Sequence, residues 1–119
     1  MGVTRIVPDL SVADVGRANA LYADLFDLDI AMDQGWVGNL GPRDAEAVQL
    51  QVVTTDVTAP CNPVMSVGVD SAAELDAVYT RVRAAGLDVV HPPTDEPWGV
   101  YRFFFRDLDG NVVNVVAHR

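Results

Sequence analysis

The sequence contains a single cysteine, Cys61, and few basic residues. One cysteine excludes an internal disulfide framework and a zinc site built from several cysteines. Because 8 basic residues stand against 17 acidic ones, the formal net charge is −9. This balance argues against a nucleic-acid partner, whose phosphates require Lys and Arg. An acidic chain is compatible with a cationic ligand, but a negative net charge more often serves solubility alone.

Long hydrophobic runs are also absent. No segment approaches the roughly 20 apolar residues of a membrane span, and the N-terminus lacks the pattern of a signal peptide. We therefore expect a cytoplasmic protein without a membrane partner. The length of 119 residues, half of them hydrophobic, is typical of one domain with its own core. The sequence predicts a single domain spanning residues 1–119.

The two halves of the chain repeat the same order of elements. In the first half, residues 3–8 form an extended run closed by Asp9. Ser11 and Asp14 resemble a capping box at the start of a helix. Strand-like segments follow at residues 28–32, 36–40 and 47–54. The helix has apolar residues at three- and four-residue steps, which predicts one buried face. These residues are Val15, Ala18, Leu21, Tyr22, Leu25 and Phe26.

The second half begins with an extended run at residues 64–69. Ser71 and Glu74 form a capping box, and Gly86 is suited to the position after a helix C-terminus. Strands are expected at residues 87–90, 101–106 and 111–117, and the proline-containing segment 58–63 links the halves. This order predicts an α+β fold. Two tandem βαβββ modules, residues 1–59 and 62–119, would form one cupped mixed sheet with the helices on its outer face.

Alternation along the strands separates a uniformly apolar face from a mixed one. The apolar sets belong beneath the helices, and the mixed sets face water or a cavity. Because four strands show the same division, we favour a small-molecule pocket. The side chains expected to point inward are Thr4, Gln49, Gln51, Ser66, Arg102, Phe104, Val112 and Asn114. Trp36 and Trp98 would add flat surfaces on which an aromatic ligand can stack, although ordinary packing explains Trp36 equally well.

A motif near the C-terminus resembles a known family. Pro97-Trp98-Gly99 is followed by Phe103 and Phe105 and then by the turn Asp107-Leu108-Asp109-Gly110-Asn111, in which Leu108 replaces the usual proline. Val7-Pro8-Asp9-Leu10-Ser11, with Tyr22 and Leu25-Phe26 after it, is similar to the first strand and helix of the same family. The chain thus resembles the vicinal oxygen chelate superfamily, which includes glyoxalase I, extradiol dioxygenases and drug-binding proteins of the bleomycin-resistance type.

The resemblance implies four positions for the ligands of a divalent metal. In this sequence they are occupied by Gly2, Gln49, Val64 and Asn114. One glycine, one valine and two amides do not make a metal site of useful affinity. His91, placed before Pro92 at a strand end, and His118 are expected at the surface or in a loop. No metal or other cofactor is therefore expected, although a divalent metal is not excluded.

Few inward residues suit acid–base or nucleophilic chemistry. Arg102 stays protonated and would favour an anionic or carbonyl group of a ligand. Asp95 and Glu96 lie in a predicted loop, where they would be solvated or attract a cation. Cys61 lies in the linker, away from the predicted cup and without a neighbouring base.

Two hypotheses remain open. The first is a metal-free binding protein that sequesters an aromatic, drug-like compound, as the antibiotic-resistance branch of the family does. The second is an enzyme of the superfamily, a glyoxalase-like lyase or a dioxygenase, with an atypical metal site. A homodimer is expected in either case, because family members commonly assemble as dimers.

Overall fold

The computed structural model describes residues 2–119 and contains one eight-stranded mixed sheet with two helices. The first module comprises β1 (Val3–Ser11), α1 (Val15–Phe26), β2 (Asp29–Asp33), β3 (Val37–Gly41) and β4 (Leu50–Val53). The second comprises β5 (Met65–Val69), α2 (Ala72–Ala84), β6 (Val89–Glu96), β7 (Val100–Arg106) and β8 (Val112–His118). The predicted α+β class and the tandem βαβββ order are confirmed.

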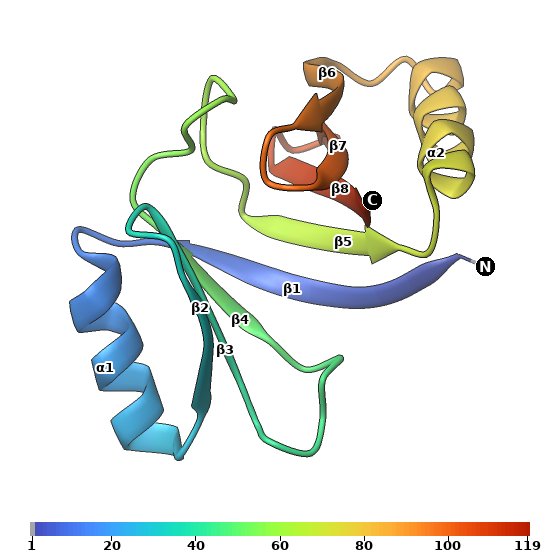
Figure 1. Cartoon of the computed structure of the whole chain (residues 1–119). Helices are drawn as coiled ribbons and strands as arrows, with labels where there is room; N and C mark the ends of the chain where they lie inside the picture. Colours follow the sequence, from blue (N-terminus) through green and yellow to red (C-terminus); the bar gives the residue numbers. More distant parts are fainter. Residues whose placement is uncertain (1) are drawn as a thin grey trace.

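The two modules meet at their first strands. The strand order is β2-β3-β4-β1-β5-β8-β7-β6, in which β1 and β5 pair antiparallel at the centre. Each of them also pairs parallel with the last strand of its own module, β1 with β4 and β5 with β8. Figure 1 shows β1 and β5 side by side, with the remaining strands of each module to either side. The sheet therefore has an approximate symmetry about the β1–β5 pair.

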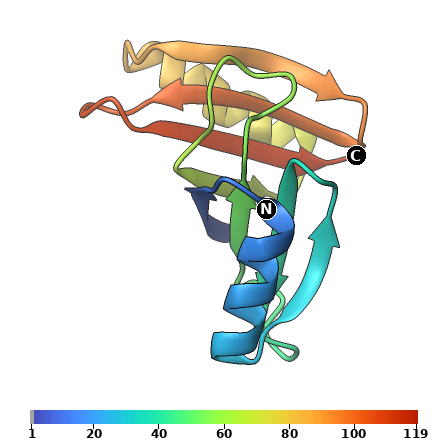
Figure 2. The same ribbon diagram turned by 90° about the vertical axis from the view of Figure 1, so that its left-hand side faces the viewer.

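Helix α2 covers the second module as the sequence predicts. The Ser71 side chain accepts a hydrogen bond from the Glu74 amide, and Gly86 has a φ of 73° just after the helix, so the predicted caps are present. Leu75 and Val82 are buried against one face of the sheet. Figure 2 shows α2 behind the strands of this module. The core beneath the helix consists of Val69, Phe103, Val115 and Ala117.

Helix α1 begins later than expected. Its N-cap is Asp14, whose side chain accepts a hydrogen bond from the Arg17 amide, whereas Ser11 still belongs to β1. The strand continues through Pro8, which pairs with Met65, and the Asp9 amide bonds to the Val64 carbonyl. Because hydrogen bonding to β5 persists beyond the proline, β1 does not end at Asp9. Neither helix within residues 2–119 has the length and apolarity needed to cross a membrane.

The predicted apolar face of α1 is only partly buried. Val15 packs inward, but Leu21 (53%), Leu25 (60%) and Phe26 (64%) remain exposed. Asn19, outside the predicted set, is buried instead, because the helix lies close to β3 at Gly38. A Cβ atom on Gly38 would come within 2.6 Å of the Asn19 Nδ2 atom. The apolar face of α1 therefore extends beyond the residues that contact the sheet.

Strand β6 is longer than expected and β4 is shorter. β6 continues through Pro92-Pro93 to Glu96. Prolines are tolerated there because β6 is an edge strand, so the backbone groups on its outer side form no hydrogen bonds with another strand. His91 consequently lies within the strand and is buried, contrary to the prediction of a loop or surface histidine. β4 covers only Leu50–Val53 rather than residues 47–54.

Candidate functional site

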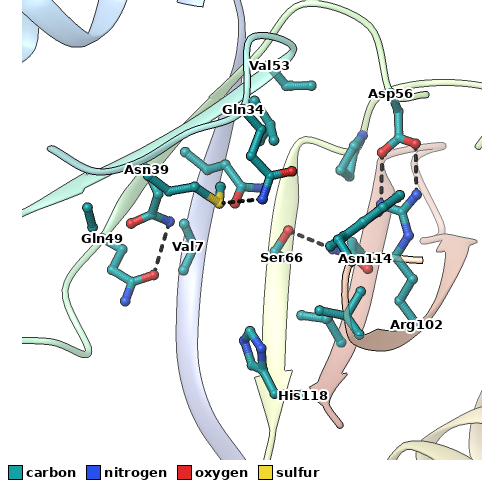
Figure 3. Close-up of a pocket in the computed structure, with 18 of the residues that line it drawn as sticks. Val7, Gln34, Asn39, Gln49, Val53, Asp56, Ser66, Arg102, Asn114 and His118 are labelled. Carbon is teal, nitrogen blue, oxygen red and sulfur yellow. Dashed lines mark hydrogen bonds and ion pairs between the residues drawn. The ribbon is translucent and has the colours of Figure 1, made fainter. Parts of the chain in front are cut away.

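The concave face of the sheet holds a cavity of about 310 Å³. Both modules and the linker contribute to its lining (Figure 3). The helices lie on the opposite face, since Gly38 contacts α1 whereas its neighbours Val37 and Asn39 line the cavity. The structure brings together most residues of the predicted set. Those that line the cavity are Trp36, Gln49, Gln51, Ser66, Trp98, Arg102 and Asn114.

Three residues expected to point inward do not line the cavity. Thr4 is exposed, because alternation along β1 places Arg5 on the cavity side together with Val7. Arg5 occupies the cavity wall in its place. Phe104 is fully buried with its ring 4.8 Å from the Arg102 guanidinium carbon, so it supports Arg102 without reaching the cavity. Val112 is buried as well, and Val116 lines the cavity on that strand.

The two tryptophans form one aromatic wall. Their rings contact edge to face, with 5.3 Å between centroids and an interplanar angle of 66°. The guanidinium of Arg102 lies 5.0 Å from the centre of the Trp98 ring, an arrangement that is attractive between a cation and a π system. Trp36 precedes β3 and Trp98 lies between β6 and β7, so each module supplies one ring.

Arg102 is the centre of a buried ionic network. Its two terminal nitrogens bind the two carboxylate oxygens of Asp56, each at 2.8 Å. Its Nε donates to Glu96 at 2.6 Å, and Nη2 also donates to the Thr58 hydroxyl at 2.7 Å. These bonds hold residues 56–58 against strand β7. The segment that contains them crosses the strands of the second module and is green in Figure 2. His91 completes the network with its Nε2 atom 3.1 Å from Glu96.

This network corrects two expectations. Glu96 is not a solvated loop acid but a buried partner of Arg102. Burial by itself would raise the pKa of both Asp56 and Glu96. Hydrogen bonds from Arg102 and from Thr58, together with the charge of Arg102, hold each pKa below its ordinary value. The same carboxylates keep the pKa of Arg102 raised despite its burial. Arg102 is thus neutralised within the protein and is not free to bind an anionic ligand.

A second polar cluster lies at the junction of β1 and β5. Asp9 accepts hydrogen bonds from Gln51 Nε2 at 2.8 Å and from the Ser66 hydroxyl at 2.6 Å. Asn114 donates to the Ser66 Oγ atom at 3.0 Å (Figure 3). Burial raises the pKa of Asp9 to about 6, although the bonds from Ser66 and Gln51 and the charge of Arg5 act in the opposite direction. The Asn114 Oδ1 atom is buried without a hydrogen-bond partner among the described residues.

A third group contains the basic side chains of the cavity wall. Arg5 donates from Nη1 to the Gln49 Oε1 atom at 3.1 Å, and its Nη2 lies 3.0 Å from His118 Nε2. Because arginine is only a donor, His118 Nε2 is the acceptor in this contact. Burial and the charge of Arg5 both lower the pKa of His118. His118 therefore lines the cavity while remaining exposed, which agrees with the expectation of a surface histidine.

Sequence reasoning missed several residues of the site. Arg5 and Asp9 lie on the same side of β1 as Val7, so a different choice between the two alternating faces of this strand would have found them. Asp56 escaped because its partner Arg102 is 46 residues away in the sequence. His118 could have been found from its alternation with Asn114 and Val116 on the last predicted strand. Asn39 could have been found from its alternation with Gly38 and Leu40 on the predicted strand.

The residues at the four positions that the family resemblance implies do not fit a divalent metal. Gly2 and Val64 lie near opposite ends of the β1–β5 pair and do not line the cavity. The Gly2 carbonyl accepts a hydrogen bond from the Asp70 amide, and the Val64 carbonyl accepts one from the Asp9 amide. Gln49 Oε1 already accepts hydrogen bonds from Arg5 and Asn39, and a guanidinium beside this oxygen repels a second cation. Within residues 2–119, no group of three or more His, Cys, Asp and Glu side chains is arranged to hold a metal ion.

Comparisons with known proteins agree with this architecture. Residues 3–115 match the family model described as the Glyoxalase/Bleomycin resistance protein/Dioxygenase superfamily. The fold is similar to a Legionella pneumophila protein described as an NAD-dependent benzaldehyde dehydrogenase, with a TM-score of 0.79, 16% identity, and coverage of 96% of this chain and 99% of that one. No curated protein matches the sequence.

Two further structures show the same fold. A member of the glyoxalase/bleomycin resistance protein/dioxygenase superfamily from Vibrio splendidus has a TM-score of 0.64 and 14% identity, covering 97% of this chain and 98% of that one. The Mn(II)-bound glyoxalase from Novosphingobium aromaticivorans has a TM-score of 0.66 and 23% identity, covering 98% of this chain but 38% of that chain. At these identities the likeness concerns the fold alone.

Proposed function

The chain belongs to the glyoxalase/bleomycin resistance protein/dioxygenase superfamily, and on that basis we propose that it is a metal-free protein that binds and sequesters a small aromatic compound. The observation that carries the proposal is the cavity with the Trp36–Trp98 pair in its wall and neutral amides around it. Apolar and aromatic walls with a few placed polar groups are typical of sites for small organic ligands.

The size and chemistry of the cavity support one ring system with polar substituents. A volume of about 310 Å³ lies at the lower end of the range of small-molecule sites. Gln51 and Ser66 are engaged with Asp9, and the ionic groups around Arg102 are engaged with one another. An aromatic body against Trp36 and Trp98 would therefore contribute most of the contact area.

Titration with aromatic compounds tests this function directly. Trp36 and Trp98 are the only tryptophans in the sequence, so fluorescence excited selectively at tryptophan reports on this wall alone. We expect a panel of aromatic antibiotics and simpler aromatic compounds to include ligands that quench it saturably. Trp36→Ala should weaken their binding about tenfold, because an aromatic contact and its buried area are lost.

The matched control is Tyr101→Phe. Tyr101 packs on the α2 side of the sheet and bonds to Asp76, so this variant should bind as the wild type does. The same affinity for Trp36→Ala, or no quenching by any compound, would contradict the proposal. Elemental analysis provides an independent test, since one equivalent of bound Ni, Zn, Fe or Mn would favour an enzyme with an atypical metal site.

We also propose a homodimer formed by a second copy of this chain. The exposed apolar side chains Leu21, Leu25 and Phe26 of α1 would be covered in such an assembly. Size-exclusion chromatography with light scattering should give about twice the chain mass of 12.8 kDa. The double variant Leu25→Lys, Phe26→Lys should shift it to the monomer, whereas Leu108→Lys, at a site 91% exposed in a distant turn, should not. A monomeric wild type at micromolar concentration would refute the dimer.

A further inference from the structure

Arg5 differs from the other basic side chains in its surroundings. Arg43, Arg81, Arg102 and Arg119 each have a carboxylate within ion-pair distance. The remaining basic residues have none among the described residues, and all of them except Arg5 are exposed. Arg5 is half-buried in the cavity wall, and within residues 2–119 its guanidinium forms hydrogen bonds with the neutral groups Gln49 and His118 only.

The positive charge of Arg5 is incompletely compensated within the protein. Burial lowers the pKa of Arg5, and the charge of Asp9 raises it. The Asp9 oxygens, however, accept hydrogen bonds from Gln51 and Ser66 rather than from Arg5. A half-buried cation without a directly bound anion is unfavourable, and a bound anion would relieve this cost.

The local geometry leaves Arg5 able to bind such a group. The contacts with Gln49 and His118 use one terminal nitrogen each, so N–H donors remain on the guanidinium. Its side chain lies across Gly68, where an added Cβ would be 2.7 Å from Arg5 Cγ and 2.9 Å from Nε. The missing side chain at Gly68 thus allows the arginine to lie flat along the wall of the cavity.

From these observations we propose that the ligand of the cavity is an aromatic acid, whose carboxylate is bound by Arg5. The proposal rests on the proposed function and adds the charge of the ligand. It reverses the expectation from composition, because a chain of net charge −9 would hold an anion at a locally positive position. Bidentate binding of carboxylates is characteristic of arginine.

Three aromatic probes of nearly equal shape test whether the cavity prefers a negatively charged ligand. Isothermal titration calorimetry should compare 2-naphthoate with neutral 2-naphthamide and cationic 2-naphthylmethylammonium at pH 7.5. We expect the acid to bind at least tenfold more tightly than the other two. Arg5→Gln should remove at least tenfold of the affinity for the acid and change that for the amide less than twofold. The control Arg106→Gln, an exposed arginine on β7, should keep the wild-type preference.

Gly68→Ala provides a second variant that keeps every charge. Its Cβ would displace the Arg5 side chain, so the preference for the acid should also fall in this variant. Equal or tighter binding of the amide or the cation by the wild type would overturn the acid proposal while leaving the aromatic-binding function intact. An acid preference that survives both substitutions would overturn the role of Arg5. Binding of none of the three probes would contradict both proposals.

Discussion

Replacing Arg102 with methionine is expected to lower the free energy of unfolding by about 3–5 kcal/mol, the usual cost of removing one partner from a buried ionic network. The substitution would leave Asp56 and Glu96 as two buried carboxylates without their cation. Methionine fills a similar volume between Trp98 and Phe104, so the loss would come mainly from the uncompensated charges. Since typical domains have 5–15 kcal/mol of stability, this variant should be near its unfolding limit.

Urea denaturation at pH 7 measures this change, with Arg106→Met as the matched control. Arg106 lies on the same strand but is exposed and bonds only to the Gly110 carbonyl, so its replacement should cost less than about 0.5 kcal/mol. Adding Asp56→Asn and Glu96→Gln to Arg102→Met should recover part of the loss, because the buried negative charges are then removed. Equal, small losses in both arginine variants would show that the network does not stabilise the fold.

The pH dependence provides a separate check on the same network. The pKa values of Asp56 and Glu96 are lower in the folded protein than their ordinary values of 3.8 and 4.5. Their contribution to stability is therefore present above those values and is lost as the pH falls through the folded pKa values. The stability difference between the wild type and Arg102→Met should accordingly narrow in acid. A difference that stays constant from neutral to acid pH would contradict the ionic origin of the effect.

The architecture was predictable because its signals are local. Capping residues such as Ser71, the position of Gly86 and the repeated strand–helix order each depend on a few neighbouring residues. The alternation in β7 and β8 also assigned Arg102 and Asn114 to the concave face. This assignment holds because the two strands pair with each other without a bulge. Where local pattern and backbone geometry agree, sequence is sufficient to predict which face a side chain occupies.

The chemistry of the site was less predictable because it depends on distant pairings. Arg102 was expected to face a ligand, but Asp56 from the segment after β4 and Glu96 from β6 occupy its donors. The sequence places Asp56 in no recognisable motif, so only the folded chain reveals that the two residues meet. On β1, the alternating set of side chains that faces the cavity contains Arg5 rather than Thr4, which changes the charge of the site.

Asp9 is expected to make the protein less stable as the pH rises from mildly acidic to neutral. Its pKa is raised from 3.8 to about 6 in the folded protein, so the native state holds a proton that the unfolded chain has already released. In such a case stability is highest below the unfolded pKa and falls until the pH exceeds the folded pKa. A shift of this size corresponds to about 3 kcal/mol in total, of which about 2 kcal/mol would be lost between pH 4.5 and 7.5.

The variant Asp9→Asn isolates this contribution, because asparagine keeps the shape of the side chain but does not ionise. His118 acts in the opposite sense: its pKa is lowered, so its contribution to stability increases as the pH rises toward 6.5. Subtracting the pH profile of Asp9→Asn from that of the wild type removes this and the other common contributions. The difference should decline by about 2 kcal/mol from pH 4.5 to 7.5 in urea-denaturation measurements.

The exposed Asp109 provides the matched control, and Asp109→Asn should keep the wild-type profile. A flat difference for Asp9→Asn would mean that the bonds from Ser66 and Gln51 fully offset burial, so that Asp9 is an ordinary ionised carboxylate. A declining difference would instead show that Asp9 titrates near neutral pH at the junction of the two modules. Because Asp9 also interacts with Arg5, the wild type should then bind an acidic probe more tightly below pH 6, where the neighbouring negative charge is removed.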